Sequence, residues 1–181
     1  STDVAIIKNI NADAIIAVYP FTPQPAITQA IIGVSEVPVF CGVGGGLTNG
    51  VRSASMAAYV EHQGAYGVVC NSKIGVETIH AIKDAVEIPV VYTVISENTD
   101  IQPYLTAGVD IINVSGAART PEIVGALRQR YPELPIIATG GPTEESILAT
   151  IRAGANAITY TPPSSASLFA KTMAGNRSEL E

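Results

Sequence analysis

The stretch PIIATGGPTEESILATIRAGANAIT, residues 135–159, contains two apolar runs of strand length on either side of a helix-like segment. The first run ends in Gly140-Gly141, Thr143 is suited to cap the following helix, and Gly154 is suited to end it. Runs rich in Ile and Ala without polar alternation are typical of strands buried on both faces. The stretch therefore predicts a strand–helix–strand unit of a parallel sheet.

The same unit recurs along the whole chain. Seven apolar runs cover residues 14–18, 37–41, 66–70, 89–95, 110–114, 135–139 and 156–160, and residues 4–10 are predicted to form a short leading helix. Seven alternations leave two architectures, a (β/α) barrel or an open doubly wound sheet. No run is clearly more polar than the others, as the edge strands of an open sheet would be. We therefore expect a TIM-barrel-like α/β barrel of about seven parallel strands. It either closes with seven strands or lacks one β/α unit of the usual barrel. Residues 1–181 are expected to form a single domain.

Turn residues support these boundaries. Hydroxyl side chains are placed to cap helices at Thr22, Ser72, Thr120 and Thr143, and glycines are placed to end helices at Gly64, Gly108 and Gly154. The phrases TAGVDII (106–112) and RAGANAI (152–158) resemble each other, with an Asp or Asn just before the strand. We interpret this repeat as structural.

Composition excludes several classes of function. Of 181 residues, 47% are hydrophobic and 14% are charged, which suits a folded core, and the net charge of −6 argues against nucleic acid as a partner. No apolar run approaches the roughly 18 residues of a membrane span, and the start of the chain lacks a signal-peptide pattern. Two cysteines do not make a disulfide framework. The sequence predicts a cytoplasmic protein with no membrane partner.

Polar residues and glycines follow the predicted strands, where a barrel of this type builds its site. Gly140 and Gly141, after the sixth strand, and Ser164 and Ser165, after the seventh, are expected to share one phosphate group, because backbone N–H groups at helix starts favour anions. Further ligand contacts are expected from Gly44 and Gly45 of CGVGGGLTNG (41–50), from Asn71 and from Ser115. Strand positions Tyr92, Thr93, Asn113, Thr139 and Thr159 are also candidates, although the sequence does not determine which of them point inward.

Two ionisable residues near strand ends are the candidate catalytic groups. Lys73 can pair with an anion, or it can be a lysine that is merely solvated at the protein surface. Glu97 can act as a general base, or it can be an acid whose place is favoured by the N-terminus of a helix. No second carboxylate occupies a comparable place, so we expect no metal site, and no cofactor is indicated. Cys41 and Cys70 are expected to be buried hydrophobes, and His62 and His80 to lie on the outside of helices.

Residues 135–159 resemble the closing segment of phosphate-binding TIM barrels, the broad group that includes thiamine-phosphate synthase and indole-glycerol-phosphate synthase. In that group the penultimate strand ends in Gly-Gly, and Ala-Gly-Ala precedes the last strand. A small seven-stranded relative, the glycerol-uptake operon antiterminator regulatory protein, is similar in length and also ends its last strand with Thr and Ser. The loop Thr161-Pro162-Pro163 departs from the glycine that commonly begins the last loop in the group.

The resemblance implies binding of a small phosphorylated or otherwise anionic metabolite at the C-terminal rim. It leaves two functions open, an enzyme with lyase, isomerase or synthase chemistry and a non-catalytic metabolite-sensing regulator of the antiterminator type. A homo-oligomer is a further expectation, because small-residue helix faces such as SASMAAYV (53–60) allow close packing between subunits.

Overall fold

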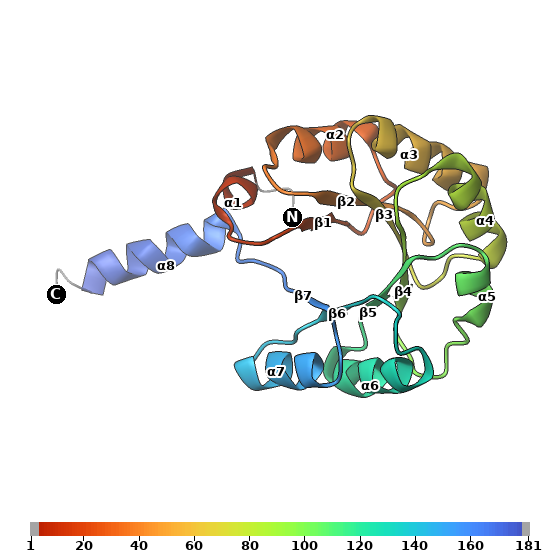
Figure 1. The fold of residues 1–181 in the computed structure, drawn as a ribbon. Coiled ribbons are helices and arrows are strands. Elements are labelled where there is room, and N and C mark those ends of the chain that lie inside the picture. Colours follow the sequence, from red (N-terminus) through yellow and green to blue (C-terminus); the bar gives the residue numbers. More distant parts are fainter. Residues whose placement is uncertain (1–3, 179–181) are drawn as a thin grey trace.

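The computed structural model describes residues 4–178; residues 1–3 and 179–181 of the expected domain lie outside this range. Strands and helices alternate along the chain (Figure 1). The seven strands are β1 Ile15–Ala17, β2 Val39–Gly44, β3 Gly67–Cys70, β4 Val90–Val94, β5 Ile111–Val114, β6 Ile136–Thr139 and β7 Ala157–Thr159. The helices are α1 Val4–Asn9, α2 Pro25–Val34, α3 Val51–His62, α4 Val76–Ala85, α5 Gln102–Thr106, α6 Thr120–Arg130, α7 Glu144–Arg152 and α8 Ser165–Ser178, with a 3₁₀ turn, Ala117–Arg119, before α6. All seven predicted strands and the leading helix are confirmed.

The sheet has the winding of a (β/α) barrel. Its strands lie in the order β1-β2-β3-β4-β5-β6-β7, and every neighbouring pair is parallel. A doubly wound sheet would instead reverse its strand order at a switch point. Within the described residues β7 does not pair with β1, so the curled sheet is an open barrel that lacks one unit (Figure 1). We call the gap between β1 and β7 the seam.

The two faces of the sheet carry different side chains. The outer face contributes residues such as Cys41, Val68 and Val90 to the large core beneath the helices. The inner face alternates with it and holds a smaller cluster of Phe40, Val69, Val91, Ile16 and Ile111. The inner cluster is small because an open barrel encloses less apolar volume than a closed one. Strand parity, which the sequence left open, is thereby determined.

The helix ends agree in part with the expected turn chemistry. Thr143 caps α7, since its Oγ1 accepts a hydrogen bond from the backbone N–H of Ser146 at 3.2 Å. Gly64, Gly108 and Gly154 adopt positive φ and end their helices as expected.

The caps predicted at Thr22 and Ser72 are wrong, because α2 begins only at Pro25 and α4 at Val76. Thr120 lies inside the first turn of α6, and its hydroxyl accepts a hydrogen bond from the backbone N–H of Gly116.

Between residues 4 and 178 no helix combines the length and apolar character needed to cross a membrane.

Candidate functional site

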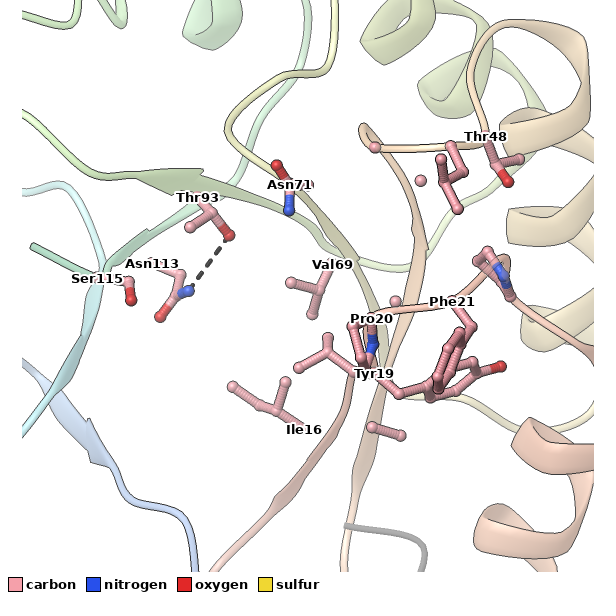
Figure 2. Close-up of a pocket in the computed structure, with 17 residues that line it drawn as sticks. Ile16, Tyr19, Pro20, Phe21, Thr48, Val69, Asn71, Thr93, Asn113 and Ser115 are labelled. Atoms are coloured by element: carbon pink, nitrogen blue, oxygen red, sulfur yellow. Dashed lines mark hydrogen bonds between the residues drawn. The ribbon is translucent and has the colours of Figure 1, made fainter.

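A cavity of about 380 Å³ opens at the C-terminal ends of β1 to β5 (Figure 2). We call it the rim pocket. One wall is the loop after β1, with Tyr19, Pro20 and Phe21, and another is the glycine-rich loop after β2. Its polar lining includes four side chains at or near the ends of β3, β4 and β5, and these are Asn71, Thr93, Asn113 and Ser115. The pocket thus lies where barrels of this type place their active sites.

Hydrogen bonds leave several polar atoms of this lining open toward a ligand. Asn113 donates from Nδ2 to Thr93 Oγ1 at 3.2 Å, while Asn113 Oδ1 is buried and has no partner within the described part of the chain. Asn71 Oδ1 accepts from the hydroxyl of Ser72 and from the backbone N–H of Lys73, so its amide nitrogen is turned toward the pocket (Figure 2). A buried oxygen without a partner is costly, which makes Asn113 Oδ1 a preferred acceptor for a ligand N–H or O–H group.

The glycine-rich loop is held close to the strand ends by the absence of side chains. A Cβ on Gly44, which lines the pocket, would lie 2.0 Å from Ser53 Oγ. A Cβ on Gly45 would lie 2.8 Å from the carbonyl oxygen of Asn71, and Gly45 has φ +102°. Gly45 therefore packs behind the pocket, where it sets the distance between the loop and Asn71.

Apolar side chains form the mouth of the pocket. Phe21 is 70% exposed and Leu47 is 80% exposed, and they come from the two loops that flank the opening. Tyr19 is oriented by its hydroxyl, which accepts a hydrogen bond from the backbone N–H of Gln24 at 2.7 Å. Residues 19–21 and Pro23 line the pocket, and α2 begins after them with Pro25 as its first residue.

Glu97 follows β4 and pairs with a cation that sequence reasoning missed. Its Oε1 accepts a hydrogen bond from Arg119, which also contacts Glu122 at 3.2 Å. The backbone N–H of Glu97 and the Arg119 guanidinium hold the pKa of the Glu97 carboxyl below its usual range. Glu97 is therefore ionised at neutral pH. The sequence signal for this pair is Arg119, which stands five residues after the end of β5 in Ser115-Gly-Ala-Ala-Arg119.

Lys73 is exposed on the turn that follows β3, before α4 begins. Its backbone N–H donates to Asn71 Oδ1 at 3.2 Å, so this turn helps to fix the Asn71 side chain. Neither Lys73 nor Glu97 is among the described residues that line the rim pocket, in which Tyr19 is the one ionisable side chain.

The four residues expected to share a phosphate lie after β6 and β7, outside the lining of the rim pocket. The N–H of Gly140 donates to the carbonyl of Thr159 at 3.1 Å, and a Cβ on Gly140 would meet Ile158 at 2.6 Å. Ser164 caps α8 by accepting from the N–H of Ser167 at 3.1 Å, and Ser165 is the first residue of that helix. Gly141, at φ +80°, precedes the capping box of α7.

The cysteines and histidines take the places expected for them. Cys41 and Cys70 are buried on the outer face of the sheet, and burial raises the pKa of the Cys41 thiol to about 11 and that of the Cys70 thiol to about 12. His62 and His80 are exposed on α3 and α4. Across residues 4–178 no group of three His, Cys, Asp or Glu side chains is arranged to hold a metal ion.

No protein-family model matches this sequence, and neither does any curated protein. Solved structures match the fold. A protein of Burkholderia cenocepacia, provisionally assigned as a phosphonomutase, is 16% identical with a TM-score of 0.66, and the match covers 98% of each chain. QR15, an aldolase, is 17% identical with a TM-score of 0.69, over 86% of this chain and 80% of QR15.

The phosphoenolpyruvate phosphomutase of Streptomyces platensis subsp. rosaceus is 18% identical with a TM-score of 0.62, over 84% of this chain. This chain spans 64% of that phosphomutase. Identities this low show a shared TIM-barrel-type fold, and function has to be argued from the site.

Proposed function

We propose that the rim pocket binds a small metabolite that carries a carboxylate or phosphate group and serves lyase, isomerase or synthase chemistry on it. The proposed acid–base groups are Glu97 and Lys73, which lie outside the pocket lining, on the loops that follow β4 and β3. The observation that carries this proposal is the convergence of Asn71, Thr93 and Asn113 on one cavity, with amide and hydroxyl groups that lack partners on the pocket side. Few, well-placed polar groups in a mostly apolar pocket are typical of small-molecule sites.

The chemistry of the lining supports a ligand with both acceptors and a donor. Hydrogens of the Asn71 amide and of the Thr93 and Ser115 hydroxyls can be donated to carboxylate, phosphate or carbonyl oxygens. Asn113 Oδ1 can accept one hydrogen from a hydroxyl or amine of the ligand. Neutral donors aimed at an oxygen on which charge develops also favour enolate-type transition states. The aldolase and the phosphomutase that share this fold support the same class of chemistry by analogy.

A non-catalytic metabolite sensor is the second candidate. It is favoured by the scarcity of ionisable groups, since Tyr19 is the one such side chain among the described residues of the pocket wall. In this alternative the loops around the pocket report the presence of a ligand without converting it.

Thermal denaturation in the presence of phosphate, sulfate, pyruvate and triose phosphates tests binding. A ligand of the native state raises the melting temperature as its concentration exceeds its dissociation constant. We expect Asn113→Leu to abolish the rise. The control Asn98→Leu, which replaces an exposed amide on the loop after β4, is expected to retain it. The opposite result would be a ligand that no longer raises the melting temperature of Gly141→Val but still raises that of Asn113→Leu. This result would place the anion at the Gly140–Gly141 loop and contradict binding in the rim pocket.

Turnover of the stabilising ligand separates the two candidate functions. An enzyme loses product formation in Glu97→Gln or Lys73→Ala while the ligand still raises the melting temperature. A sensor forms no product even as the parent protein. Stabilisation by none of the four probes would contradict both candidates for this class of ligand.

A further inference from the structure

Most of the exposed large apolar side chains of the described chain gather in two regions. One set surrounds the rim pocket and includes Phe21 and Leu47. The other set belongs to the seam and to the elements next to it, and it comprises Val4 on α1, Leu148 and Ile151 on α7, Tyr160 after β7, and Leu168, Phe169 and Met173 on α8. The second set has no role in the proposed site.

The seam is a second cavity, of about 540 Å³, between the unpaired edges of β1 and β7. Its walls are largely apolar and include Ile16, Phe40, Ile137, Ile151 and Ile158. In a (β/α) barrel the helix that follows a strand packs back over the sheet. The helix that follows β7 is α8, so α8 is the element expected to cover this opening.

Helix α8 instead extends away from the barrel (Figure 1). Its 14 residues span about 21 Å at 1.5 Å per residue, enough to run along the height of a short strand. Phe169 is 72% exposed and shares one side of the helix with Leu168 and Met173. Exposed apolar side chains grouped in such a stripe form a surface suited to binding a partner.

The linker to α8 explains why the helix does not cover its own seam. Pro162-Pro163 stands between β7 and α8, and residues 160–164 have no regular structure. Each proline fixes its own φ near −65° and disfavours a helical conformation in the residue before it. The linker is therefore stiff and extended, and it carries α8 outward from the chain to which it belongs.

We propose that α8 of one copy of this chain docks over the seam of a second copy, and that the second copy returns the same contact. Charge agrees with this pairing. Among residues 165–174, the part of α8 whose side chains the structure describes, Lys171 is the one charged residue. The seam carries Asp13, and α7 beside it begins with Glu144-Glu145. Exchange of one element between identical copies is a two-fold arrangement, which closes as a dimer and does not grow into a filament.

Light scattering on a size-exclusion column tests the assembly. We expect the parent protein to have twice the 18.8 kDa mass of one chain. Phe169→Glu combined with Met173→Glu places charge on the apolar stripe and is expected to weaken the dimer by about tenfold or more, since each buried apolar side chain contributes about one to two orders of magnitude. The control is Ala174→Glu, on the other side of the helix, which is expected to leave the dimer intact. A parent that is monomeric at all concentrations, or a dimer unaffected by the charged stripe, overturns the proposal.

Cross-linking distinguishes exchange between copies from docking within one chain. Ile151→Cys and Phe169→Cys are prepared as separate single variants, mixed in equal amounts and treated with a short bismaleimide, while Cys41 and Cys70 are shielded by burial. Exchange predicts a covalent dimer in the mixture. If the mixture gives no covalent dimer and the double variant cross-links only within one chain, α8 covers its own seam and the proposal is wrong. These readouts do not depend on a ligand, so they are independent of the proposed function.

Discussion

Asp110 and Asn156 perform the same structural task at the start of two different strands. Asp110 Oδ2 accepts a hydrogen bond from the backbone N–H of Val90 at 2.8 Å, and Asn156 Oδ1 accepts one from the N–H of Ile136 at 2.9 Å. In both cases the donor is the first residue of the preceding strand. Each oxygen also accepts from a cation, Lys83 for Asp110 and Arg128 for Asn156. The repeated phrases TAGVDII and RAGANAI thus encode one structural device.

Removing either oxygen is expected to destabilise the fold without affecting the rim pocket. Asp110→Ala and Asn156→Ala each leave a strand N–H without its acceptor, which costs about 1–3 kcal/mol. Asn156→Asp keeps an acceptor and is expected to stay within about 0.5 kcal/mol of the parent. Urea denaturation measures these differences. An Asn156→Ala protein as stable as the parent would show that the repeat has no structural role.

Acid is expected to weaken the contact between the loops after β4 and β5. The pKa of Glu97 is lower in the folded chain than in the unfolded one, so its contribution to stability is present above the ordinary glutamate pKa. This contribution is lost as the pH falls through the lowered folded value. Melting temperatures from pH 7 to pH 3 should show the parent and Glu97→Gln converging at low pH, with Glu122→Gln as the matched control. A constant difference across this range would contradict the prediction.

Gly45 and Gly46 are adjacent in the sequence but are expected to tolerate alanine very differently. A Cβ on Gly45 meets backbone atoms of Asn71 from 2.8 Å, at a φ of +102°, whereas a Cβ on Gly46 has nothing within 4 Å. Gly45→Ala is expected to destabilise the protein by about 1–3 kcal/mol, the range for strained backbone positions, and to shift Asn71 away from the pocket. Gly46→Ala is expected to change stability by less than about 1 kcal/mol. Chemical denaturation of the pair decides the matter, and equal effects would contradict this account of the loop.

Both cysteines are expected to be unreactive in the native protein. Burial raises the pKa of Cys41 to about 11 and that of Cys70 to about 12, so neither forms an appreciable thiolate at neutral pH. An aromatic disulfide reagent should label both thiols in denaturant and neither within the same time under native conditions. Fast labelling of one thiol in the native state would reveal a local opening of the outer layer.

The sequence by itself determined the seven strands and the leading helix, and it favoured the barrel winding over an open doubly wound sheet. These features depend on contiguous residues: a short apolar run, a capping residue such as Thr143, and a glycine such as Gly154 that adopts positive φ. An apolar run that is buried on both faces, and a residue that caps or ends a helix, each leave a pattern within one strand–helix unit of the sequence. Such a unit can therefore be recognised from the sequence before any long-range contact is known. The candidate residues Asn71 and Ser115 followed from the same rule about strand ends.

Only the tertiary structure decided which side chains meet. Thr93 and Asn113 face the same cavity because of the register between β4 and β5, and a slip of β5 by one residue would have turned Asn113 into the outer layer. The pairing of Glu97 with Arg119 joins loops that are separated by a helix and a strand. The open seam depends on the curvature of the whole sheet. Contacts of this kind arise from the relative placement of distant units, which no local pattern specifies.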